Sequence, residues 1–99
     1  MKARSLTFYI EPDRLGEVLR VVDELIVPIY RKLPGFVGLV VLRAEHVPRE
    51  LIGLSVWDGD LAVSEEAIAA FREKIAMVSG ASAATETFDV LRLVSTERS

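Results

Sequence analysis

Residues 33–39 read LPGFVGL, and this stretch decides the fold. Its proline and glycine end a helical run, and the apolar residues that follow them directly begin a strand. A second marker, SVWD at 55–58, ends another apolar strand with a tryptophan and an aspartate. A helix that turns at once into a strand, with a second strand close behind, predicts one small α+β unit.

The first half of this unit lies before Pro34. Residues 3–10 alternate apolar with polar side chains, which is the period of a strand. Residues 15–29 carry apolar side chains at helical spacing. Pro28 lies inside this helix and removes one backbone hydrogen bond, so we expect the last turn to bend or loosen near Glu24.

The second half follows Gly35. Asp58 and Asp60 offer carboxylates that could cap a second helix. The remaining predicted elements are a hairpin of strands at 36–44 and 51–57, that second helix ending near Gly80, and a last strand at 85–94. The order β-α-β-β-α-β predicts a ferredoxin-like α+β fold, an antiparallel four-stranded sheet with two helices on one face. For a chain of 99 residues we expect one domain, residues 1–99, without an internal boundary.

Composition excludes several classes of function. The chain has no cysteine, so it has no disulfide framework, thiolate metal site or cysteine nucleophile. A formal charge of −3 argues against a nucleic-acid partner, which would need clustered Lys and Arg. Charged residues make up 27% of the chain, and Thr7 and Glu11 interrupt any N-terminal apolar segment, so we expect neither a membrane partner nor a signal peptide. We therefore expect a cytoplasmic protein.

The two middle strands predict a partner chain. In residues 36–42 and 51–57, apolar side chains point to both faces of the sheet, whereas two helices can cover only one face. Leaving four such side chains in water would forfeit about 1.5–3 kcal/mol each. We therefore expect a homodimer in which the bare sheet faces of two copies close on each other.

These features together resemble the antibiotic biosynthesis monooxygenase-like family. The resemblance is carried by PGFVG at 34–38, VWD at 56–58 and SEEA at 64–67 on the following helix, and it spans nearly the whole chain. It implies a dimeric α/β barrel, and it is closest to bacterial members without an assigned reaction. Catalytic members bind an aromatic polyketide, a quinol or haem between sheet and helices, and they use no metal or flavin cofactor.

The resemblance matches Trp57 to the tryptophan that family members carry at the end of the third strand. Haem-degrading members also have an Asn on the first strand and a His on the second helix. This chain has Thr7 and Phe8 in the first region and no histidine after Trp57, and it contains no Asn at any position. The resemblance therefore implies an aromatic or quinone-like ligand and no cofactor, and it leaves the catalytic residues unknown.

The candidate ligand-binding residues are Trp57, Ser55, Tyr9, Tyr30 and Arg43. Gly53 and Ser55 precede Trp57 on one face of their strand, and small residues under a helix layer can leave a hollow. Tyr9 and Tyr30 could present hydroxyl groups to a phenol or quinone, and Arg43 could pair with an acidic ligand. Each also has a structural interpretation: core packing for Trp57, amphipathic surface rings for the tyrosines and a solvated charge for Arg43.

Other reactive residues are weaker candidates. His46 is the only histidine, and it lies in the hairpin loop without the neighbouring ligands that a metal site needs. Three functions remain open at this point: a cofactor-independent monooxygenase acting on an aromatic or quinone-like compound, a non-catalytic metabolite-binding or sensing module, and a filled core with no pocket.

Overall fold

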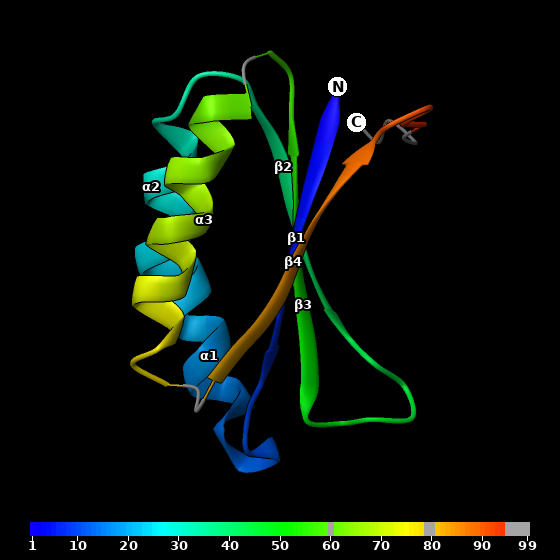
Figure 1. The fold of residues 1–99 in the computed structure, drawn as a ribbon. Helices are drawn as coiled ribbons and strands as arrows, with labels where there is room; N and C mark the ends of the chain where they lie inside the picture. The colour runs from blue at the N-terminus through cyan, green and yellow to red at the C-terminus, as the bar shows by residue number, and fades with distance from the viewer. Residues whose placement is uncertain (60, 79–80, 95–99) are drawn as a thin grey trace, which may run out of the picture.

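The computed structural model describes residues 1–59, 61–78 and 81–94, and it has the predicted order β-α-β-β-α-β (Figure 1). A four-stranded antiparallel sheet forms one layer, and the helices form a second layer on one of its faces. The elements in chain order are β1 (Lys2–Tyr9), a 3₁₀ turn (Pro12–Arg14), α1 (Leu15–Val21), a π-helical segment (Val22–Ile26), α2 (Val27–Arg31), β2 (Phe36–Arg43), β3 (Glu50–Trp57), α3 (Leu61–Ile75) and β4 (Ala81–Asp89).

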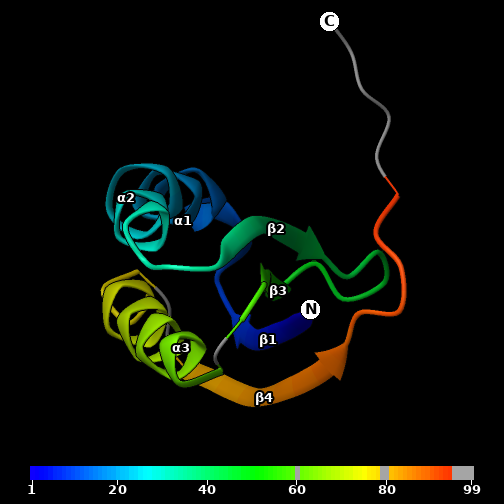
Figure 2. The same ribbon diagram turned by 90° about the horizontal axis from the view of Figure 1, so that it is seen from above.

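The strand order is β2-β3-β1-β4, which places the first strand inside the sheet. Seen from above, the strands form a curved wall and the helices lie on its concave side (Figure 2). Paired residues share a face of the sheet, so the register assigns each side chain to the helix side or the open side. Leu6 pairs with Gly53 on the helix side, and Ser5 pairs with Leu54 on the open side.

Pro28 has the effect expected from the sequence. The first long helix is interrupted by the π-helical segment Val22–Ile26, in which the amide of Val27 donates to the carbonyl of Val22. Proline cannot donate such a bond, and the wider π turn accommodates its ring before the helix resumes in α2. Buried Val22 and Ile26 still reach the core through this segment.

The turn after α2 is tied to the turn after β3. Gly35 has a positive φ of 85°, and its carbonyl accepts a hydrogen bond of 2.7 Å from the amide of Asp58. A Cβ atom at Gly35 would lie 2.0 Å from the Asp58 carbonyl oxygen, so only glycine permits this approach. The two stretches that decide the fold in sequence therefore meet in space. Asp60, predicted with Asp58 as a helix cap, lies outside the described residues.

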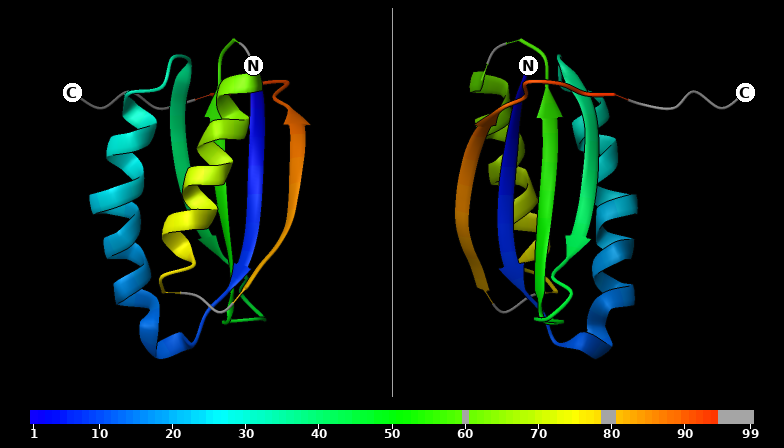
Figure 3. Two further views of the ribbon diagram at one scale, coloured as in Figure 1. Left: turned by 60° about the vertical axis from the view of Figure 1, so that its left-hand side comes forward. Right: turned by 90° about the vertical axis from the view of Figure 1, so that its right-hand side faces the viewer.

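The last strand differs from its prediction. β4 runs from Ala81 to Asp89, earlier at both ends than the expected 85–94. Asp89 pairs with Lys2, and the amide of Val90 donates to the carbonyl of Met1, where the pairing with β1 ends. Residues 90–94 continue as an irregular segment across the open side of the sheet (Figure 3). The extent of a strand depends on its neighbour as well as on its own apolar pattern, which explains the shift.

No helix covers the open face of the sheet (Figure 3, right), and the side chains that β2 and β3 place on it are apolar, as the middle strands predicted. β1 adds Ser5 and Thr7 to the same face. Val40 and Leu42 on β2 are 48% and 44% exposed, and Phe88 on β4 is 42% exposed. Between them lie half-buried residues of β3, namely Ile52, Leu54 and Val56.

Candidate functional site

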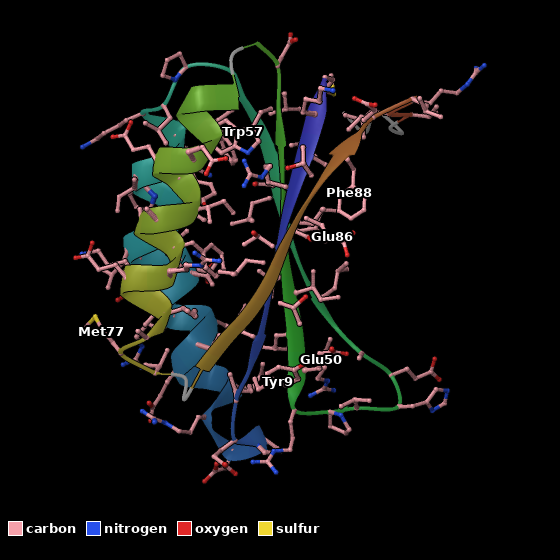
Figure 4. The ribbon with its side chains drawn as sticks, in the orientation of Figure 1. Tyr9, Glu50, Trp57, Met77, Glu86 and Phe88 are labelled. Atoms are coloured by element: carbon pink, nitrogen blue, oxygen red, sulfur yellow. The ribbon has the colours of Figure 1, made fainter. Side chains whose placement is uncertain are left out.

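An aromatic cluster lies at the Trp57 end of the sheet, between the sheet and the helices (Figure 4). Trp57 is the last residue of β3, and it pairs with Phe36, the first residue of β2. Tyr30 lies on α2. The Tyr30 ring centroid lies 5.4 Å from that of Trp57 and 5.6 Å from that of Phe36, and those two rings are 5.3 Å apart. All three pairs are tilted or edge-to-face, the arrangements that aromatic rings favour.

Each polar group of this cluster has a protein partner. The Trp57 indole Nε1 donates to Ser55 Oγ at 2.8 Å, and Ser55 Oγ donates to the Arg4 carbonyl at 3.3 Å. The Tyr30 hydroxyl donates to the Ala67 carbonyl on α3 at 2.8 Å. Burial raises the pKa of Tyr30 well above its ordinary value, so this phenol remains a neutral donor.

The space above Gly53 is occupied. A Cβ atom there would lie 2.8 Å from Cζ of Phe71, a residue of α3. Phe71 also packs against Phe8 and Tyr30, with centroid separations of 5.7 and 6.4 Å. The hollow expected over the small residues of β3 is therefore filled at Gly53.

The structure brings together only three of the five candidate residues: Trp57, Ser55 and Tyr30. Tyr9 pairs with Glu50 at the far end of the sheet and is exposed on the open side (Figure 4). Its hydroxyl lies 3.4 Å from the Glu50 carboxylate. Arg43 pairs with Leu51 near the same end and is exposed. At about 3.3 Å per strand residue, Arg43 and Tyr9 lie roughly 20 Å from Trp57, too far to share one small ligand with it.

Arg4 is a residue of this region that the sequence did not single out. It lies on β1 with the parity of Leu6 and Phe8, and its side chain is only 8% exposed. Its Nη1 donates to Glu65 on α3 at 2.6 Å, and this bond and charge hold the pKa of the Glu65 carboxyl below its usual range. An arginine in phase with two buried apolar residues is the signal in the sequence that could have revealed it.

His46 lies exposed in the loop between β2 and β3, at the end of these strands opposite Trp57. Within residues 1–59, 61–78 and 81–94, no three His, Cys, Asp or Glu side chains are placed to hold a metal ion. No helix in the same residues is both long and apolar enough to span a membrane.

Comparison with known sequences and structures identifies the family. Residues 1–77 match the family described as antibiotic biosynthesis monooxygenase. The chain belongs to that family. No curated protein sequence gives a significant match.

Solved structures share the fold of this family member at low sequence identity. A Bordetella bronchiseptica protein, provisionally named an antibiotic biosynthesis monooxygenase, superposes with a TM-score of 0.74 at 10% identity, covering 92% of this chain and 97% of that one. Rv0793 from Mycobacterium tuberculosis gives 0.66 at 17% identity, covering 95% and 98%. SnoaB from Streptomyces nogalater, a cofactor-independent oxygenase solved as an asparagine-to-alanine mutant, gives 0.64 at 18% identity, covering 94% and 95%. These likenesses establish the ferredoxin-like α+β fold.

Proposed function

We propose that this chain is a cytoplasmic, dimeric, cofactor-independent monooxygenase that binds a small aromatic or quinone-like compound beside Trp57. The observation that carries the proposal is the cluster of Tyr30, Phe36 and Trp57 at one end of the molecule, in which the first and last rings are buried and that of Phe36 is half-buried. Aromatic faces with one or two fixed polar groups suit a flat ring system that carries oxygen substituents. Family membership supports oxygenase chemistry for such a ligand.

The proposed reaction needs no group beyond the substrate and dioxygen. An anthrone, for example, loses the two hydrogens of its CH₂ group and gains one oxygen atom from O₂ to become a quinone, while the second oxygen atom leaves as water. The electrons that reduce O₂ come from the substrate. The protein would hold the ring against Trp57 and keep water away from the reacting carbon.

The dimer is proposed to form through the open face of the sheet. That face presents Val40, Leu42, Leu54 and Phe88 to solvent in the single chain. The segment after β4 adds Leu91, which is 90% exposed. A second copy turned by a two-fold axis would cover both sets at once, because the same patch then lies on both partners. Isolated Leu or Val side chains are normal on a surface, but a patch of them on neighbouring strands marks an interface.

Oxygen consumption tests the catalytic half of the proposal. The protein is incubated in air with a panel of anthrones and quinols, and O₂ uptake is compared with that of Trp57→Phe. We expect uptake with at least one substrate and a marked loss in the variant, which keeps a ring but loses the indole N–H to Ser55. Equal uptake by both proteins across the whole panel would rule out a role for Trp57 in catalysis.

A non-catalytic binding or sensing module is the second candidate. It is favoured by the cluster itself, in which the polar contacts are a hydroxyl and backbone carbonyls and include no His, Asp or Glu as a general base among the described residues. Saturable quenching of Trp57 fluorescence by a quinone without any O₂ uptake would support this function over the oxygenase.

A further inference from the structure

Glu86 places a carboxylate on the open face of the sheet. It lies on β4, pairs in register with Ser5 of β1 and is exposed beside Phe88 (Figure 4). A second copy closing on this face would remove the carboxylate from water, which is costly unless a cation enters the interface with it. The proposed dimer therefore requires a cation that can reach Glu86.

The cations on the strands do not meet this requirement. The register places Lys2, Arg4 and Arg43 on the helix side of the sheet. Arg49, in the loop before β3, is bonded to Glu11 at 2.7 Å. Among the described residues, the cation that remains for the open side lies on the segment after β4.

Arg92 is this cation, and it belongs to residues 90–94, which cross the open side of the sheet (Figure 3). Within the described part of the single chain, neither Arg92 nor Glu86 has an ion-pair partner. The neighbours of Arg92 are apolar: Leu91 is 90% exposed, Leu93 58% and Val94 88%. The segment thus crosses its own sheet without burying these side chains, and it presents them on the side where a second copy would lie.

We infer that residues 91–94 of each copy lie on the open sheet face of the other copy, where Arg92 forms an ion pair with the partner's Glu86. The inference rests on the proposed function, because it needs the proposed dimer. A two-fold axis makes the exchange mutual, so each interface contains two such pairs and leaves neither carboxylate without a cation. The alternative is that each segment folds back onto its own sheet, with the ion pair inside one chain.

Chemical cross-linking between two copies tests the exchange, because the chain has no cysteine of its own. Glu86→Cys and Arg92→Cys are made in separate chains, co-expressed and treated with a short bismaleimide, since an ion pair of two long side chains holds its Cα atoms further apart than a disulfide spans. We expect a product of twice the 11.0 kDa chain mass on a denaturing gel. Met77→Cys co-expressed with Arg92→Cys is the control, because Met77 is 66% exposed but lies on the helix side (Figure 4), and it should give little product.

Charge reversal provides a second measurement, the dissociation constant of the dimer by sedimentation equilibrium. Glu86→Arg or Arg92→Glu alone would bring like charges together, and we expect each to raise the dissociation constant at least about tenfold. The two substitutions in one chain restore opposite charges and should return the constant close to its original value. Glu24→Arg is the matched control, an exposed glutamate reversed on the helix side, and it should leave the constant unchanged.

The outcomes separate the inference from the dimer beneath it. A protein that sediments as a dimer but gives no more product from Glu86→Cys with Arg92→Cys than from the Met77→Cys control would overturn the exchange and leave the dimer standing. Failure of the double charge reversal to recover the dissociation constant would do the same. If the unmodified protein is a stable monomer, the proposed dimer itself fails, and the pairing of Arg92 with the partner's Glu86 fails with it.

Discussion

The two faces of this sheet are built from similar apolar strands, but the side chains are buried on one face and exposed on the other. On the helix side, Leu6, Phe8 and Trp57 are buried, and each polar group of the aromatic cluster has a partner. On the open side, residues of equal hydrophobicity, such as Leu42, lie in water. One face therefore supplies the core and the candidate site, whereas the other leaves apolar side chains exposed in the single chain, which is the reason for the proposed dimer.

Placing a charge on the open face should have the largest effect. Leu42→Arg would bury two uncompensated guanidinium groups in a symmetric interface, so we expect the dimer dissociation constant to rise at least about a hundredfold. Leu19→Arg is the control, because Leu19 on α1 is 41% exposed against 44% for Leu42 and lies on the helix side. Sedimentation velocity of both variants measures the shift. An equal effect of the two substitutions would mean that the sheet face has no special role.

Substitution at the contact between the turn after α2 and the turn after β3 should have the next largest effect, a loss of stability. Gly35→Ala would force a Cβ atom against the Asp58 carbonyl at a positive φ, and we expect a loss of roughly 2–4 kcal/mol in the free energy of unfolding. Gly16→Ala in α1 meets no atom within 4 Å and should be neutral or slightly stabilising. Urea denaturation of the two variants gives the comparison. An unchanged midpoint for Gly35→Ala would contradict the close approach of the two turns.

A glycine pair distinguishes the two faces directly. Gly53→Ala on the helix side would push against the Phe71 ring and should destabilise by about 1–3 kcal/mol. Gly38→Ala in β2, paired with Val56 on the open side, meets nothing within 4 Å and should be close to neutral. Thermal unfolding followed by circular dichroism measures both. Identical melting temperatures would show that the space above Gly53 is not filled as described.

The smallest expected effect is a dependence of stability on pH. Because Arg4 lowers the pKa of Glu65 in the folded state, the pair contributes stability above about pH 4.3, the ordinary glutamate pKa, and loses it as pH falls through the lowered value. Wild type should therefore melt slightly higher than Glu65→Gln at pH 7, and the gap should close in acid. Glu66→Gln serves as the control on the same helix. A gap that widens in acid would contradict this sign.

Local patterns in the sequence were sufficient for the order of the elements. The Pro34-Gly35 stop marked the junction of helix and strand, and Pro28 marked the loosened turn that the structure shows as a π-helical segment. These features depend on a few neighbouring residues, which is why the sequence reveals them. The apolar residues on both faces of β2 and β3 likewise predicted a sheet face that the helices leave uncovered.

The site was harder to predict because it depends on contacts between distant segments. Phe71, from a helix after β3, fills the space above Gly53, and nothing near Gly53 in the sequence indicates this. Tyr9 and Arg43 lie at the opposite end of the sheet from Trp57, which only the strand register reveals. Arg4 was missed because an arginine near the start of a chain reads as a surface charge, although its phase with Leu6 placed it inside.

The mass of the unmodified protein in solution tests the contrast between the two faces most directly. Sedimentation equilibrium at micromolar concentration should give a species of about 22 kDa, twice the 11.0 kDa of the chain. Trp57 fluorescence should remain that of a buried indole in the same sample. A stable species of 11.0 kDa under these conditions would contradict the account. The apolar side chains of the open sheet face would then be exposed to solvent in a stable monomer.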